Sequence, residues 1–232
     1  MKKVIQNPLN LILFIGIIGL YVAFMTLMVF TNTPARLINQ LKFMSIVLCF
    51  GLALSLYQRS HNKKDSKYVI FALTFTVIAD IFLLFTTRHI PGVLSFWLVQ
   101  LLYLKRYHNR LFGAGIIAVV IAIPLIFLLP FESLHIIAGT YAILIMLCFF
   151  ATFKTKLPIF NLVCIRLGML LFILCDVHVA LFNLLARSHP YFPIASIAMW
   201  FFYLPSQLLL ALSASHAEIF TPVKDEKTSL IG

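Results

Sequence analysis

Long apolar runs separated by short polar segments make up most of this chain. The runs predict helices over about 8–31, 38–58, 68–87, 91–107, 111–131, 134–153, 161–186 and 193–215. Each is close to the roughly 20 residues that a helix needs to cross the hydrocarbon core of a bilayer. Proline, asparagine or clustered charges mark the breaks between runs. We expect an all-α, polytopic bundle of eight transmembrane helices in one domain, residues 1–220, followed by a flexible cytoplasmic tail at 221–232.

Composition supports a membrane protein and argues against a soluble domain. The chain is 62% hydrophobic and 11% charged, with a mean hydropathy of +1.03, whereas soluble domains are about half apolar and a quarter charged. The formal net charge of +11 reflects basic residues in short loops, as an orientation signal requires, rather than a nucleic-acid surface. The expected surroundings are a lipid bilayer, with the chain as a multi-pass protein of the cell membrane. The sequence leaves the oligomeric state open.

The distribution of Lys and Arg predicts the orientation of the helices. With the N-terminus in the cytoplasm, only four basic residues fall on the outer side. These are Arg36, Lys42, Arg88 and Arg187. All the others fall on the inner side, and because cytoplasmic loops carry an excess of Lys and Arg, this asymmetry favours an even number of spans with both termini inside.

Two aspartates lie well inside predicted membrane helices. Asp80 is in the run IFALTFTVIADIFLLF, and Asp176 is in RLGMLLFILCDVHVALFN. A carboxylate near the bilayer centre costs several kcal/mol, so such residues normally face a protein interior and serve a function. Two of them on separate helices form a candidate general acid and base.

Further polar and aromatic residues share faces with these aspartates or occupy helices four and eight. The candidate binding residues are Phe96, Trp97, Gln100, Tyr103, Asn183, Trp200, Tyr203 and Gln207. Helices one, two, five and six are nearly featureless, so we expect a pocket among helices three, four, seven and eight. The alternative is that these groups only hydrogen-bond one another and hold the helices together.

Cysteine and histidine give no sign of a metal site or a disulfide framework. Cys49, Cys148, Cys164 and Cys175 all fall within predicted spans without a CxxC pair, so buried free thiols are expected. His178 points away from Asp176 on its helix and is interpreted as a core residue with its hydrogen bonds satisfied. No GxSxG, HExxH or phosphate-binding glycine loop occurs.

The two halves of the chain echo each other weakly. Helices three and seven each contain one Asp, and helices four and eight each contain a Trp and a Gln. A parallel duplication of four helices would produce this pattern.

The order of these residues resembles the YhhN-like lysoplasmalogenase family of eight-span membrane proteins over most of the chain. The residues that carry the resemblance are Asp80, Leu83, Leu84, Gly92, Phe96, Tyr103, Gly168, Phe172, Asp176, Ala180, Tyr203 and Gln207. Two positions depart from the family pattern: Ala79 stands where the family has Gly or a similarly small residue, a mild change, and Gln100 stands where the family usually has His.

The resemblance implies hydrolysis of the vinyl ether of a lysoplasmalogen, a lysophospholipid, to a fatty aldehyde and a glycerophospho-base. Protonation of the alkene carbon and attack by water need one protonated acid and one ionised base, roles that Asp80 and Asp176 can fill. An ether hydrolase of this kind needs no metal and no organic cofactor. The rival interpretation is a non-catalytic transporter or lipid-binding protein, because intramembrane aspartates also serve proton relays.

The charge asymmetry leads to a direct test of topology. Reporter fusions after Lys67 and after Lys227 should both report the cytoplasmic side. Lys67 follows two predicted spans and Lys227 follows eight, so each lies on the same side as the N-terminus. An outer signal at either position would refute the orientation.

Overall fold

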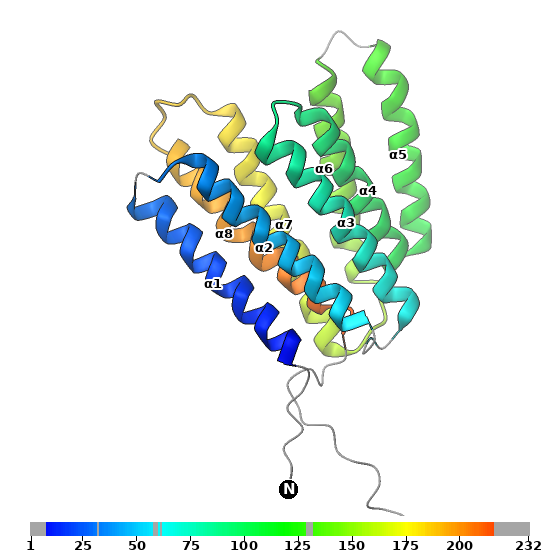
Figure 1. Cartoon of the computed structure of the whole chain (residues 1–232). Helices are drawn as coiled ribbons and strands as arrows, with labels where there is room; N and C mark the ends of the chain where they lie inside the picture. Colours follow the sequence, from blue (N-terminus) through cyan, green and yellow to red (C-terminus); the bar gives the residue numbers. More distant parts are fainter. Residues whose placement is uncertain (1–7, 32, 58–59, 61, 129–131, 216–232) are drawn as a thin grey trace, which may run out of the picture.

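A computed structural model describes residues 8–31, 33–57, 60, 62–128 and 132–215 of the chain (Figure 1). The described part is helical, and each of the predicted helices is present. Their bounds are α1 Pro8–Phe30, α2 Ala35–Leu56, α3 Lys63–Phe85, α4 His89–Tyr107, α5 Asn109–Leu128, α6 Ser133–Thr152, α7 Ile159–Leu184 and α8 Phe192–Leu212. The predicted tail at 221–232 lies outside the described residues.

The helix α3 begins earlier than its apolar run. It starts at Lys63 rather than near residue 68, because the Asn62 side chain caps it by accepting hydrogen bonds from the backbone N–H of Lys64 (2.9 Å) and of Asp65 (3.4 Å). Asp65 in the first turn adds favourable charge at the positive end of the helix. Basic residues that hydropathy assigns to a loop therefore belong to the first turns of α3.

Seven of the described helices are long and apolar enough to cross a membrane. The exception is α4, which contains a buried Gln100 and ends in Lys105 and Arg106. It packs against α3, α5 and α6 within the bundle, and its polar groups therefore face protein rather than lipid. The chain is a multi-pass membrane protein in which one of the eight helices depends on its neighbours for an apolar environment.

Six of the helices form a closed ring. Neighbouring contacts run from α2 to α3, α4, α6, α7, α8 and back to α2. Helix α1 lies outside this ring against α2 and α8, and α5 lies outside against α4 and α6, at opposite sides of the molecule (Figure 1). The two helices that bear the intramembrane aspartates, α3 and α7, are therefore on opposite sides of the ring.

The packing repeats between the two halves of the chain. Helix α1 contacts α2 and α8, as α5 contacts α6 and α4; the pairs α2–α3 and α3–α4 correspond to α6–α7 and α7–α8. This is the arrangement expected of two four-helix units related by an approximate two-fold axis, which would exchange α3 with α7. The weak echo in the sequence thus has a counterpart in the packing.

Glycine allows α3 and α4 to lie close together beside Asp80. A Cβ atom added to Gly92 would lie 2.8 Å from Cγ of Leu83 and 3.3 Å from the carbonyl oxygen of Ala79. Real Cβ atoms do not approach so closely, so a larger residue would force Leu83 or the helix to move. Gly92 therefore fixes the spacing of α4 from the part of α3 that carries the acid.

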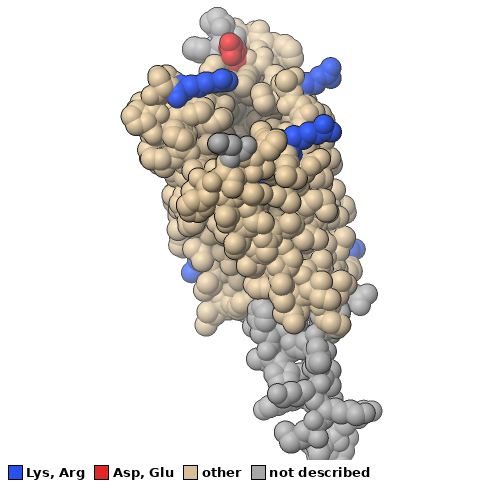
Figure 2. Space-filling model, turned by 60° about the vertical axis from the view of Figure 1, so that its left-hand side comes forward, with Lys and Arg blue, Asp and Glu red and all other residues tan. Residues whose placement is uncertain are grey.

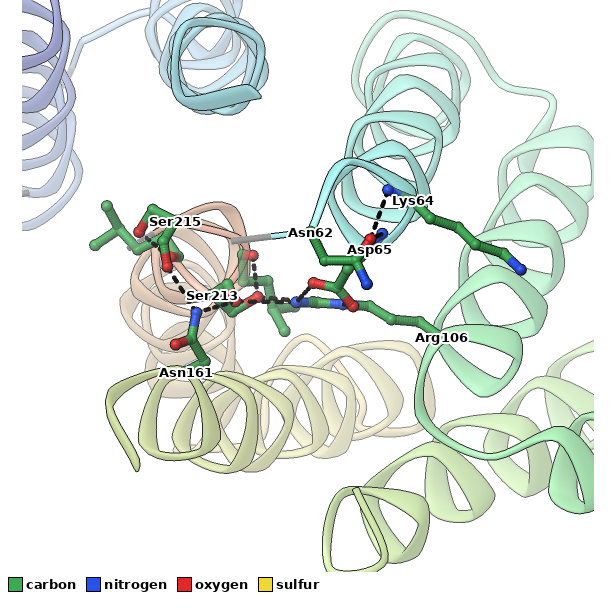
Figure 3. Close-up of polar contacts among 9 residues, drawn as sticks. Asn62, Lys64, Asp65, Arg106, Asn161, Ser213 and Ser215 are labelled. Atoms are coloured by element: carbon green, nitrogen blue, oxygen red, sulfur yellow. Dashed lines mark hydrogen bonds and ion pairs between the residues drawn. The ribbon is translucent and has the colours of Figure 1, made fainter. Parts of the chain in front are cut away.

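A buried arginine ties four helix ends together at one end of the bundle (Figure 3). Arg106 of α4 is fully buried and donates from Nε and Nη2 to the two carboxylate oxygens of Asp65, at 2.8 and 2.7 Å. It also donates to the hydroxyl (2.7 Å) and carbonyl (3.0 Å) of Ser213, just after α8. Asn161 of α7 donates to the carbonyls of Ser213 and Ser215, both at 2.8 Å.

The pairing of Arg106 with Asp65 predicts that substitution of Asp65 strongly lowers the stability of the protein. Asp65→Asn removes the anion while leaving Arg106 buried, and we expect a loss of about 3–5 kcal/mol, since breaking one side of a buried ion pair leaves an uncompensated charge. Thermal unfolding of the purified protein in detergent measures it.

The matched control is Glu132→Gln. Glu132 lies 3.9 Å from His135, and both side chains are largely exposed, so this change should leave the unfolding temperature nearly unchanged. Equal stability of the two variants would show that Arg106 does not depend on Asp65.

Candidate functional site

Asp80 is held inside the ring by a tyrosine from α8. Its side chain is 3% exposed, and the Tyr203 hydroxyl lies 3.0 Å from both carboxylate oxygens. A buried carboxyl group loses its contacts with water and requires a hydrogen-bond partner in return. The pair therefore fixes both the position of the acid and the orientation of the tyrosine ring.

Asp176 has the same kind of partner from a different helix. The Tyr141 hydroxyl of α6 donates to Oδ2 of Asp176 at 2.7 Å. In contrast to Asp80, Asp176 is only partly buried, and Val177 beside it is exposed. On a membrane helix, exposed apolar residues face lipid, so this carboxyl lies at the boundary between the ring interior and the lipid-facing surface.

Two phenylalanines connect the acids. The Phe96 ring of α4 contacts both tyrosines, with centroids 5.9 Å from Tyr141 and 6.5 Å from Tyr203. Phe172 of α7 packs on Phe96 at 5.8 Å and on Tyr203 at 5.9 Å. Because each tyrosine also holds one carboxylate, the two acids and these aromatic rings form a single cluster across the inside of the ring.

Fully buried amide and hydroxyl groups follow this cluster along α4 and α8. Both polar side-chain atoms of Gln100 and of Gln207 are buried without a hydrogen-bond partner among the described residues, as are the hydroxyls of Tyr103 and Ser206. The Gln100 amide is near the Tyr141 hydroxyl, outside hydrogen-bonding geometry. Buried polar groups without protein partners normally bind ordered water or a ligand.

The two tryptophans have different surroundings. Trp200 packs edge-on against Tyr203 with centroids 5.2 Å apart, and the Lys42 ammonium lies 4.5 Å from the centre of its ring. Trp97 instead donates from its indole N–H to the carbonyl of Ile137 at 2.9 Å, which ties α4 to α6. Trp200 is thus next to the acids, whereas the polar atom of Trp97 already has a structural partner.

Some predicted residues lie elsewhere. Asn183 is exposed, and its amide donates to the carbonyl of Val179 in its own helix, so the structure does not bring it to the cluster. His178 has its hydrogen bonds satisfied, as predicted, but it is only partly buried: its ring nitrogens contact the Leu174 carbonyl at 2.7 Å and the Tyr191 hydroxyl at 3.0 Å. The four cysteines are buried and free, as predicted.

Two residues at the site escaped the sequence analysis. The interpretation of the second and sixth helices as featureless is wrong, because α6 supplies Tyr141 and α2 supplies Lys42. The assignment of Lys42 to the outer-side basic residues missed its burial: it lies inside α2 and is 6% exposed. A lone Lys within an apolar run was the available signal for Lys42, while nothing in the local sequence distinguishes Tyr141 from an interfacial tyrosine.

Comparison with known proteins identifies the family. The sequence model of the YhhN family matches residues 37–214, which include the whole cluster and more than half of the chain. The chain belongs to the YhhN family. This family is lysoplasmalogenase-like. No curated protein and no solved structure matches the chain.

The YhhN match agrees with the earlier resemblance and extends from α2 through α8. It begins after α1, the helix that lies outside the ring and contacts the site through Phe24, whose ring packs edge-on against Trp200 with centroids 5.9 Å apart. The matched residues therefore include both acids, their two tyrosines and the two phenylalanines between them.

The tyrosine–aspartate pairs predict that the free energy of unfolding depends on the two tyrosine hydroxyl groups. Tyr203→Phe and Tyr141→Phe each remove the hydroxyl that binds a buried or partly buried carboxylate. We expect losses of about 1–3 kcal/mol, the cost of leaving a buried polar group without its partner, with the larger loss for Tyr203 because Asp80 is more deeply buried.

Tyr21→Phe is the matched control for these variants. Tyr21 also donates between helices, from α1 to the carbonyl of Phe201 at 3.0 Å, but at an exposed position. Its loss should be the smallest of the three in thermal unfolding, and an equal loss for all three variants would argue against special roles for the two acids.

Proposed function

We propose that this protein is an alkenyl ether hydrolase of the cell membrane that cleaves lysoplasmalogens, with Asp80 and Asp176 as its acid and base. The observation that carries the proposal is the pair of intramembrane carboxylates, each held by a tyrosine hydroxyl from another helix and joined by shared aromatic rings. Membership of the lysoplasmalogenase-like YhhN family supports the substrate class.

The reaction needs a proton donor and a proton acceptor on either side of the vinyl ether. The acid transfers a proton to the alkene carbon remote from oxygen, and the adjacent carbon becomes an oxocarbenium centre. Water adds to that centre and gives up a proton to the second carboxylate. The resulting hemiacetal transfers its hydroxyl proton to the glycerol oxygen as the carbon–oxygen bond breaks, which releases a fatty aldehyde and the glycerophospho-base. Positioned proton transfer of this kind contributes about 10²–10⁴-fold to rate.

The surroundings of the two carboxylates differ, which suits a division of roles. Asp80 is enclosed by the ring, whereas Asp176 is at the lipid-facing boundary. An alkenyl chain arriving from the bilayer would meet Asp176 first and pass along Phe96 and Phe172. These aromatic faces carry partial negative charge and can stabilise the oxocarbenium ion.

Water for the second step needs hydrogen-bond partners near the acids. Gln100 and Gln207 present buried amide groups with free donors and acceptors one turn from Phe96 and Tyr203. We assign these amides to binding the attacking water, a role that does not require a titratable group. Gln100 can therefore replace the usual His in this respect, although it does not carry a proton as His does.

The rival function is proton or solute transport. The observation that favours it is the series of unpartnered polar groups that continues past the glutamines to Tyr103 and Tyr107, toward the Arg106 cluster. A column of bound water along these groups would conduct protons as well as supply a hydrolase. The same purified protein distinguishes the two functions, because only a hydrolase releases aldehyde.

The decisive experiment measures aldehyde release from lysoplasmenylethanolamine and lysoplasmenylcholine by purified protein. Asp80→Asn and Asp176→Asn keep the side-chain volume but remove the titratable proton, and each should lower the rate about a hundredfold or more. Folding should suffer little, because an amide is easier to bury than a carboxylate.

Glu132→Gln removes an acid that is exposed and remote from the cluster, and its rate should equal that of the wild type. If the aspartates only hold helices together, the Asn variants should lose activity in step with their thermal stability. A wild-type protein that releases no aldehyde would leave transport or lipid binding as the function.

A further inference from the structure

Lys42 is a buried cation without an anionic partner in the described part of the chain. Its side chain is 6% exposed and projects from α2 over the Trp200 ring. Two of the carboxylates in the described part of the chain have other neighbours: Asp65 pairs with Arg106, and Glu132 lies 3.9 Å from His135. Asp80 and Asp176 are bound by tyrosines instead. A lysine inside a membrane helix is costly and normally marks a ligand or ion site.

The contact with Trp200 does not satisfy this ammonium group. A cation over an aromatic ring gains about 0.5–2 kcal/mol, but a lysine ammonium carries three N–H donors and a ring face accepts from it only weakly. In the described residues no carboxylate, hydroxyl or carbonyl is hydrogen-bonded to Lys42 Nζ. The group is therefore oriented by Trp200 and retains donors for an anion.

A series of contacts links Lys42 to one of the acids. Lys42 stacks on Trp200, Trp200 packs against Tyr203, and Tyr203 binds Asp80. In a lysoplasmalogen, only the glycerol carbons separate the phosphate from the vinyl ether. One substrate molecule with its vinyl ether at Asp80 would therefore carry its phosphate toward the Lys42 end of this series of contacts.

The charge at this end of the molecule agrees with an anionic headgroup. Arg36, Arg88 and Arg187 are exposed at the end of the bundle where α1 joins α2, α3 joins α4 and α7 joins α8. Figure 2 shows Lys and Arg side chains beside a hollow in this end of the surface. Basic side chains around an opening raise the local concentration of anions.

We propose that Lys42 and Trp200 form a subsite for the phosphate of a lysophospholipid, with Lys42 as the charged donor. This inference rests on the proposed function for its substrate class and adds the residue that distinguishes a phospholipid from a neutral alkenyl glycerol. The alkenyl chain then extends from Asp80 toward Asp176 and the lipid-facing side of α7, which orients the substrate in the ring.

Binding can be tested without hydrolysis. The probes are a 1-O-alkyl lysophosphatidylcholine, whose saturated ether is not cleaved, and the matching 1-O-alkylglycerol, which lacks the phosphate. Quenching of tryptophan fluorescence in detergent measures the affinity of each. Wild type should bind the phosphate-bearing ligand at least about tenfold more tightly, the usual worth of one charge-assisted hydrogen bond.

Lys42→Met should abolish this preference and leave the affinity for the alkylglycerol unchanged, while Lys42→Arg should preserve it. The matched control is Lys105→Met, because the Lys105 ammonium also lies over a ring, that of Phe112 at 4.9 Å, but at the Arg106 end of the bundle rather than beside Trp200. Lys42→Gln serves in place of Lys42→Met if the latter does not fold, as judged by thermal unfolding.

Retention of the preference in Lys42→Met and Lys42→Gln would overturn the proposal, as would equal binding of the two ligands by wild type. Displacement of the lipid by millimolar inorganic phosphate would show a site for free phosphate and would also overturn it. The outcome is separate from that for the hydrolase: a protein that binds through Lys42 but releases no aldehyde refutes only the reaction. Conversely, an active hydrolase indifferent to Lys42 refutes only this subsite.

Discussion

The structure depends on the free-energy cost of taking a polar group into the bilayer without a hydrogen-bond partner. The two intramembrane carboxylates avoid this cost through tyrosines of other helices. Asp80 and Asp176 obtain their partners from Tyr203 and Tyr141, and each bond joins a helix from one side of the ring to a helix from another. The acids are therefore constraints on helix packing as well as candidates for chemistry, because their hydrogen bonds require α3 to meet α8 and α7 to meet α6.

The two ends of the ring differ in how the protein holds a buried positive charge. At the end with the first turn of α3, Arg106 is fully paired with Asp65 and with atoms of Ser213, so its charge is used in holding helix ends together. At the other end, Lys42 is held only by an aromatic ring. Between them, buried glutamines and tyrosines have no protein partners among the described residues. One end is thus satisfied by the protein itself, while the other retains hydrogen-bonding capacity for a ligand.

The repeated packing of the two halves explains why a ring with two acids arises from one chain. A pseudo-two-fold arrangement places α3 and α7 in equivalent positions and α1 and α5 outside the ring. The equivalence is broken at the acids: Asp80 is buried and held by α8, whereas Asp176 is only partly buried and held by α6. Two identical carboxyl groups thereby acquire different surroundings, which an acid–base pair requires.

The sequence alone determined the helices and which two acidic residues lie within them. Apolar runs of membrane-spanning length fix the number and approximate bounds of helices, since the bilayer leaves the backbone no other way to satisfy its hydrogen bonds. The free-energy cost of a charge in lipid also makes Asp80 and Asp176 stand out in the sequence, because ionisable residues are rare within membrane helices. Helical periodicity also placed His178 correctly on the side away from Asp176, because that relation is local to one helix.

Only the tertiary structure decided which helices meet and what each side chain contacts. Tyr141 reaches Asp176 because α6 packs beside α7, and Trp97 is bound to Ile137 because α4 packs beside α6. Lys42 joins the site because α2 completes the ring against α8. Asn183 shares a helical face with Asp176, yet the exposed end of α7 leaves it outside. Periodicity specifies a face of one helix, whereas the neighbour of that face is set by packing between segments far apart in the chain, which no local pattern of residues records.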